Sequence, residues 1–72
     1  MKKHTFNNYW CRLFNTYNEQ YAIYQTTVWS SKKHLKRAID NGEPAISCTI
    51  SRANGTVLST CYYDVETQTY FY

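Results

Sequence analysis

The first part of the chain has the residue pattern of two β-strands. The stretches Thr5–Phe14 and Tyr21–Trp29 are rich in aromatic and β-branched side chains, which favour extended backbone. The polar segment Asn15–Gln20 between them has the composition of a turn, so the pattern predicts two antiparallel strands joined by a short loop. Alternation leaves open which side of the first strand faces inward: Tyr9, Cys11 and Leu13, or Trp10, Arg12 and Phe14.

The pattern then changes to the period of a helix over residues 31–41. An apolar stripe at i, i+3 and i+4 spacing predicts its buried face, formed by Leu35, Ala38 and Ile39. Ser30 and Ser31 can cap the start, and Asn41-Gly42 favours a left-handed stop.

Period-two alternation returns after Ala45 and predicts a strand with one buried face, Ile46, Cys48 and Ile50, and an opposite face of Ser47, Thr49 and Ser51. Asn54-Gly55 then indicates a hairpin with a two-residue type I′ turn. Counting from that turn gives the expected cross-strand pairs Ala53–Thr56, Arg52–Val57, Ile50–Ser59 and Cys48–Cys61. A last strand is predicted over Thr67–Tyr72.

These elements define the expected fold class. The order ββαβββ predicts an α+β protein, residues 1–72 as one domain, with an antiparallel sheet of four to five strands and one helix packed on one face. Thirteen of the 72 residues are aromatic, eight of them tyrosine, so we expect a core built from rings. A domain this short is often stabilised by disulfides, a metal or a partner, and a homodimer is one open alternative.

The chain offers few residues for a metal site or for catalysis. Two of its cysteines, Cys48 and Cys61, are expected to be neighbours, and core packing is favoured over a disulfide because no apolar leader or membrane span follows Met1 and a reducing cytoplasm is expected. The spacing of Cys11, His4 and His34 relative to these cysteines matches no zinc motif. No histidine has an evident acid to orient it and no glycine-rich phosphate loop is present, so we expect neither an enzyme nor a cofactor.

Half of the eight basic residues lie in the predicted helix: Lys32, Lys33, Lys36 and Arg37, here called the basic ridge. At about 100° per residue, Lys33 and Arg37 are expected outermost, with Lys36 on one flank and His34 on the other. A solvated face helped by a Lys36–Asp40 pair is one interpretation. Three cations in the first turn oppose the helix dipole, however, so local stability does not explain the cluster. The other interpretation is therefore that the ridge binds an acidic or phosphate-bearing partner.

The aromatic residues are too numerous for one covered sheet face, so some are expected outside. Exposed tyrosines are common on open sheets, but Tyr and Trp also anchor protein interfaces. We assign Tyr24 and Trp29, with the basic ridge, to a partner-binding surface.

The stretch from Ser30 to Tyr63 combines a Lys/Arg-bearing helix, a strand, an Asn-Gly turn and a returning strand with aromatics near its end. This layout resembles some phage-encoded anti-CRISPR proteins that act on type I CRISPR surveillance complexes. The resemblance implies a non-enzymatic inhibitor that docks on a host defence complex, with Lys32, Lys33, Lys36 and Arg37 matching its basic helix. A small nucleic-acid-binding protein is the alternative, and a virion subunit is a third hypothesis.

Overall fold

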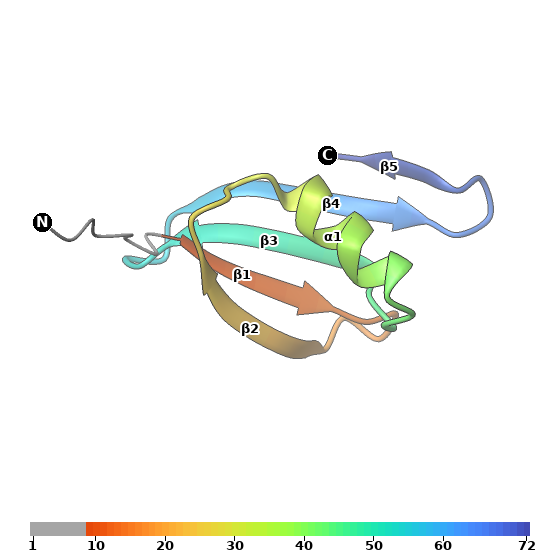
Figure 1. The fold of residues 1–72 in the computed structure, drawn as a ribbon, viewed down its shortest axis with the longest axis horizontal. Coiled ribbons are helices and arrows are strands. Elements are labelled where there is room, and N and C mark those ends of the chain that lie inside the picture. Colours follow the sequence, from red (N-terminus) through yellow and green to blue (C-terminus); the bar gives the residue numbers. More distant parts are fainter. Residues whose placement is uncertain (1–8) are drawn as a thin grey trace, which may run out of the picture.

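Five strands form a single antiparallel sheet in the computed structural model, which describes residues 9–72. The elements in chain order are β1 (Tyr9–Phe14), β2 (Gln20–Thr26), α1 (Ser31–Asp40), β3 (Ser47–Arg52), β4 (Val57–Asp64) and β5 (Thr69–Phe71). The sheet order is β2-β1-β3-β4-β5, so β2 and β5 are its edges, and α1 lies across one face (Figure 1). The predicted α+β class and the ββαβββ order are confirmed.

The predicted helix signals are present at both ends of α1. Ser30 is the N-cap and its hydroxyl accepts a hydrogen bond from the Lys33 amide at 3.3 Å. At the other end, Gly42 has φ of +82° and donates to the Ile39 carbonyl, while the Glu43 amide donates to the Ala38 carbonyl. This left-handed stop ends the helix and fixes the position of Glu43 beside it. With ten residues, α1 is too short and too polar to span a membrane.

The side of β1 that faces the helix is the one carrying Cys11 and Leu13, which are 0% and 2% exposed. The core comprises Cys11, Leu13, Leu35, Ala38, Ala45, Cys48, Ile50 and Cys61. The expectation of a core built from rings is therefore wrong, because Tyr9, Tyr21, Tyr63 and Tyr70 pack only around its margin. Small side chains let α1 approach the sheet closely, whereas tyrosine hydroxyls need polar partners or water.

The hairpin between β3 and β4 forms, but its loop differs from the predicted one. Gly55 has φ of +96° and its amide donates to the Arg52 carbonyl, while the Arg52 amide donates to the Thr56 carbonyl at 2.8 Å. The loop thus has three residues, and the predicted Ala53–Thr56 and Arg52–Val57 pairs are wrong. The Asn54 side chain explains the change, since its oxygen accepts from the Thr56 amide.

A bulge further along restores the predicted register. Ser51 is opposite Val57 and Ile50 is opposite Ser59, so Leu58 is the extra residue of β4. The three-residue loop shifts the pairing by one residue and the bulge shifts it back. The predicted pairs Ile50–Ser59 and Cys48–Cys61 are therefore confirmed.

Two predicted strands are longer than the observed ones. β2 ends at Thr26 rather than Trp29, because the Thr26 hydroxyl accepts from the Val28 amide at 3.0 Å and turns the chain toward α1. β5 begins only at Thr69, after Gln68 with φ of +57°. The predicted strand residues 5–8 lie outside the described residues.

The second face of β3 also departs from its pattern. Ser47 and Ser51, expected opposite the buried face, are 6% and 3% exposed. Each is flanked by a large ring from the neighbouring strand: Phe14 is the cross-strand neighbour of Ser47, and Trp10 that of Ser51. Neighbouring side chains therefore bury small residues on a face that α1 does not cover.

The three cysteines form one group in the core. All are free and fully buried, and the sulfurs of Cys11 and Cys48 lie 3.4 Å apart. Contact with Cys11 together with burial raises the pKa of the Cys48 thiol, and burial raises the pKa of Cys61. The expectation of cysteines as small core residues is confirmed.

We expect these thiols to resist a water-soluble disulfide reagent while the protein is folded, because the reactive form is the accessible thiolate. In denaturant, all three should react rapidly. Spectrophotometric thiol titration with and without denaturant measures both rates. Rapid native reaction of any of the three would contradict the described core.

Candidate functional site

The basic ridge lies on the exposed side of α1. Lys32, Lys33, Lys36 and Arg37 are all exposed, and the buried side of the helix is formed by Ser31, His34, Leu35 and Ala38. This buried stripe is rotated relative to the predicted one, since Ile39 is only half-buried. At about 100° per residue, Lys33 and Lys36 are then outermost and Arg37 lies on a flank, which corrects the expected arrangement.

Little of the positive charge is neutralised within the described residues. Lys36 Nζ lies 3.6 Å from Asp40 Oδ2, the expected i,i+4 pair, and both side chains are well exposed. Lys32 Nζ lies 5.7 Å from the centre of the Tyr70 ring. No ion pair within residues 9–72 involves Lys33 or Arg37, and no acid lies in the first turn of α1. Asp40 offsets one of the four positive charges, so α1 keeps a net charge of +3 from its Lys, Arg and Asp side chains.

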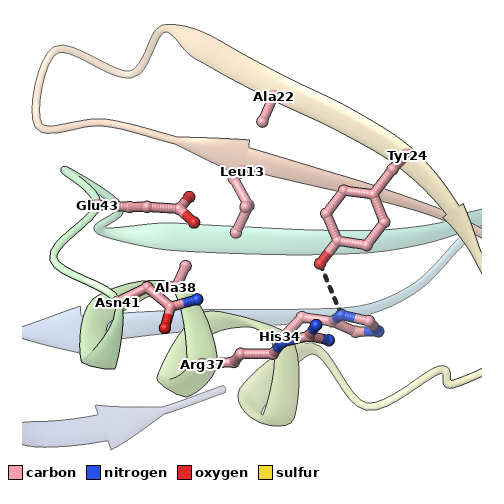
Figure 2. A pocket seen from close by; sticks show the side chains of 8 residues that line it. All are labelled: Leu13, Ala22, Tyr24, His34, Arg37, Ala38, Asn41 and Glu43. Carbon is pink, nitrogen blue, oxygen red and sulfur yellow. Dashed lines mark hydrogen bonds between the residues drawn. The ribbon is translucent and has the colours of Figure 1, made fainter.

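A cleft of about 380 Å³ separates the Arg37 flank of α1 from the edge strand β2 (Figure 2). Its residues are Leu13, Ala22, Tyr24, His34, Arg37, Ala38, Asn41 and Glu43. Two sequence-predicted site residues, Tyr24 and Arg37, thus meet at one cleft. Figure 2 shows Tyr24 reaching from β2 to His34 at one end of the cleft, with Asn41 and Glu43 at the other.

His34 organises that end of the cleft. The residue is 6% exposed, so the expectation that it flanks the ridge is wrong. His34 Nε2 lies 2.9 Å from the Val28 carbonyl oxygen, and Nδ1 lies 2.8 Å from the Tyr24 hydroxyl. Because a carbonyl oxygen only accepts, Nε2–H is the donor, and in the neutral ring Nδ1 accepts from Tyr24. The third polar contact of the ring is with the Thr26 hydroxyl, which lies 3.2 Å from Nε2.

These contacts place the Tyr24 hydroxyl in a fixed position at the cleft. Burial, followed by a hydrogen bond with Cys11, raises the pKa of Tyr24 well above its usual value. The hydroxyl therefore stays protonated at neutral pH and serves as a hydrogen-bonding group.

The opposite end of the cleft carries a carboxylate. Tyr21 donates a hydrogen bond of 2.8 Å to Glu43 Oε1, and burial together with this bond raises the pKa of Tyr21. The cleft thus has an exposed cation, Arg37, and an exposed anion, Glu43, above an apolar floor.

Sequence reasoning missed the roles of His34, Asn41 and Glu43. The sequence spacing that could have predicted the burial of His34 is its i, i+1, i+4 relation to Leu35 and Ala38, which places it on the buried stripe of the helix. The sequence pattern marks Asn41 only as part of the helix stop and gives Glu43 no role. Their place at the cleft depends on how the chain leaves α1.

Trp29, the remaining predicted site residue, lies elsewhere. It is 60% exposed and lines a mostly apolar hollow of about 590 Å³ with Val28, Ser30, Ser59 and Tyr72. Trp29 and Tyr24 therefore belong to separate hollows, and the structure does not bring them together.

The protein is thus a small α+β domain with a cationic helix over a five-stranded antiparallel sheet. Within residues 9–72, no three His, Cys, Asp or Glu side chains converge as metal ligands. Comparisons with protein-family models, curated proteins and solved structures found no match.

Proposed function

We propose that this protein is a non-enzymatic inhibitor that binds a host defence complex in the cytoplasm, in the manner of anti-CRISPR proteins directed at type I surveillance complexes. The basic ridge supplies the electrostatic half of the contact, and exposed aromatic residues supply the apolar half. Binding there blocks the interaction of the complex with nucleic acid or nuclease.

One observation carries this proposal: four cations lie exposed on ten residues of helix, with a single exposed ion pair among residues 9–72. Such a concentration of like charge is not explained by helix stability, because the N-terminal turn favours anions. It is suited to a surface that carries carboxylates or phosphates.

The cleft beside the ridge extends this contact surface. Arg37 belongs to both features, since it is part of the ridge and lines the cleft with Tyr24. Tyr and Arg are the residue types that contribute most to protein interfaces. A partner loop that contacts the ridge therefore has a fixed aromatic hydroxyl and a cation within one continuous surface.

Replacing Lys33 and Arg37 together by Glu is expected to abolish capture of the partner, because attraction becomes repulsion. Binding to purified type I surveillance complexes, and their cleavage of target DNA, are the measurements. Ala53→Glu is the control, since Ala53 is exposed in the β3–β4 loop and belongs neither to the ridge nor to the hollows lined by Tyr24 and Trp29. Undiminished capture by the folded double variant contradicts the proposal.

The alternative function, direct binding of nucleic acid, is favoured by the same ridge. It predicts that affinity for DNA or RNA falls steeply with added salt, with a slope that loses about one unit for each phosphate contact removed. Co-purification from the native host followed by mass spectrometry separates the two functions. A protein partner retained without nucleic acid at physiological salt supports the inhibitor.

A further inference from the structure

The sheet face turned away from α1 forms a second surface, here called the open face. Cross-strand register arranges it in three rows: Phe14–Ser47–Tyr62–Phe71, Ile23–Arg12–Thr49–Thr60 and Trp10–Ser51–Val57. Within residues 9–72 every strand belongs to this sheet and the helix packs on the opposite face, so no described helix or strand covers these rows.

Large apolar side chains occupy the margin of the open face. Ile23, Val57, Tyr62 and Phe71 are 45%, 58%, 52% and 46% exposed, and Trp10 and Phe14 are half-buried. The Tyr62 and Phe71 rings stack with 6.4 Å between their centres. Exposed apolar residues that gather on one face, rather than lying scattered, mark an interaction surface.

A cation lies in the middle row of this apolar surface. Arg12 has Ile23 and Thr49 as its cross-strand neighbours and is half-buried. Its Nε is buried and has no hydrogen-bond partner among the described residues, which also hold no ion pair to Arg12. Ser51 Oγ, in the adjacent row, is likewise buried without a partner. Buried polar groups are rarely left unpaired, and a partly desolvated guanidinium gains most from a charged acceptor.

We propose that the open face docks on a partner protein that presents a carboxylate side chain surrounded by apolar residues. The carboxylate pairs with the Arg12 guanidinium, and the apolar residues cover the aromatic margin. This surface lies on the opposite side of the sheet from the basic ridge, so it is independent of the function proposed above.

The charge distribution of the open face favours a carboxylate-bearing protein over a second copy of the chain and over single-stranded nucleic acid. A second copy of the chain, related by a two-fold axis through the middle row, brings two Arg12 guanidinium groups together in an apolar contact, which is costly. Single-stranded nucleic acid needs a cationic groove along its backbone as well as stacking rings. Arg12 is the one cation in the three rows, whereas the four cations of the ridge lie across the sheet.

The test is an NMR titration of the full-length isotope-labelled protein with two blocked tripeptides, Phe-Glu-Phe and Phe-Gln-Phe. The Glu peptide is expected to shift the amides of β1, β3 and β4 and to bind about tenfold more tightly than the Gln peptide, as a charged hydrogen-bonded pair requires. Arg12→Met keeps the apolar stem and should reduce this ratio to about one. Arg52→Met is the matched control and should retain it.

The amide spectrum of each variant reports whether it is folded. A ratio unchanged in Arg12→Met overturns the proposal, as do shifts confined to α1, which assign the peptide to the basic ridge. Open-face amides that move with protein concentration alone identify a second copy instead. A short oligothymidylate that binds this face more tightly than the Glu peptide assigns it to nucleic acid.

Discussion

Ile50→Asp is expected to unfold the protein at room temperature. Ile50 is 0% exposed within the core beneath α1, so the variant places a carboxylate among apolar side chains. An unpaired buried charge costs several kcal/mol. In a domain of this length the hydrophobic core contributes roughly 3–5 kcal/mol to the free energy of unfolding, so this cost is comparable to the whole stability. Far-ultraviolet circular dichroism and urea unfolding measure the loss.

Val57→Asp is the matched control for this variant. Val57 is 58% exposed on the neighbouring strand β4, so its carboxylate remains hydrated and the free energy of unfolding should change by less than about 0.5 kcal/mol. A cooperatively folded Ile50→Asp protein would mean that the other side of the hairpin faces the helix.

His34→Leu is expected to lower the free energy of unfolding by about 2–3 kcal/mol. Leucine fills a comparable volume but leaves the Val28 carbonyl oxygen and the Tyr24 hydroxyl without the ring nitrogens that they contact at 2.9 and 2.8 Å. The damage should concentrate where β2 leads into α1, because these bonds join the strand and its following loop to the helix. Chemical denaturation gives the free energy, and amide hydrogen exchange locates the change.

Tyr24→Phe separates the two halves of that network. It removes only the hydroxyl that contacts Nδ1, at a half-exposed site, and should cost about 0.5–1.5 kcal/mol. If His34→Leu and the unmodified protein have the same free energy of unfolding, the hydrogen bonds of the buried ring contribute no net stability to the packing of β2 against α1.

The elements of this fold follow from local patterns. The Ser30 cap, the Asn41-Gly42 stop and the apolar positions between them predict α1 to within one residue at its end. Such signals are local, since caps and turns depend on side chains within a few residues of the backbone groups that they satisfy. The loop at Asn54-Gly55 was predicted as a turn but with the wrong length, because the choice between two and three residues depends on the side-chain bond of Asn54 to Thr56.

The candidate site was predictable only in part. Charge clustering in the sequence is sufficient to find the basic ridge, and its exposure follows from the helix period. The cleft could not be found that way, because Tyr24, His34 and Glu43 come from a strand, a helix and a loop that only packing brings together. No local pattern separates Trp29 from Tyr24, which line different hollows.

The order of the strands and helix, the inward placement of Ile50 and the gathering of cations on one helix are all predictable from the amino-acid sequence. These properties arise from periodicity and from neighbours along the chain. Only the packed structure shows that the tyrosine rings lie at the margin of the core, that His34 is buried against β2, and that Arg12 has no partner among residues 9–72 on the sheet face opposite α1. The physical reason is that burial and pairing depend on which side chains meet across strands, and no local pattern contains that information.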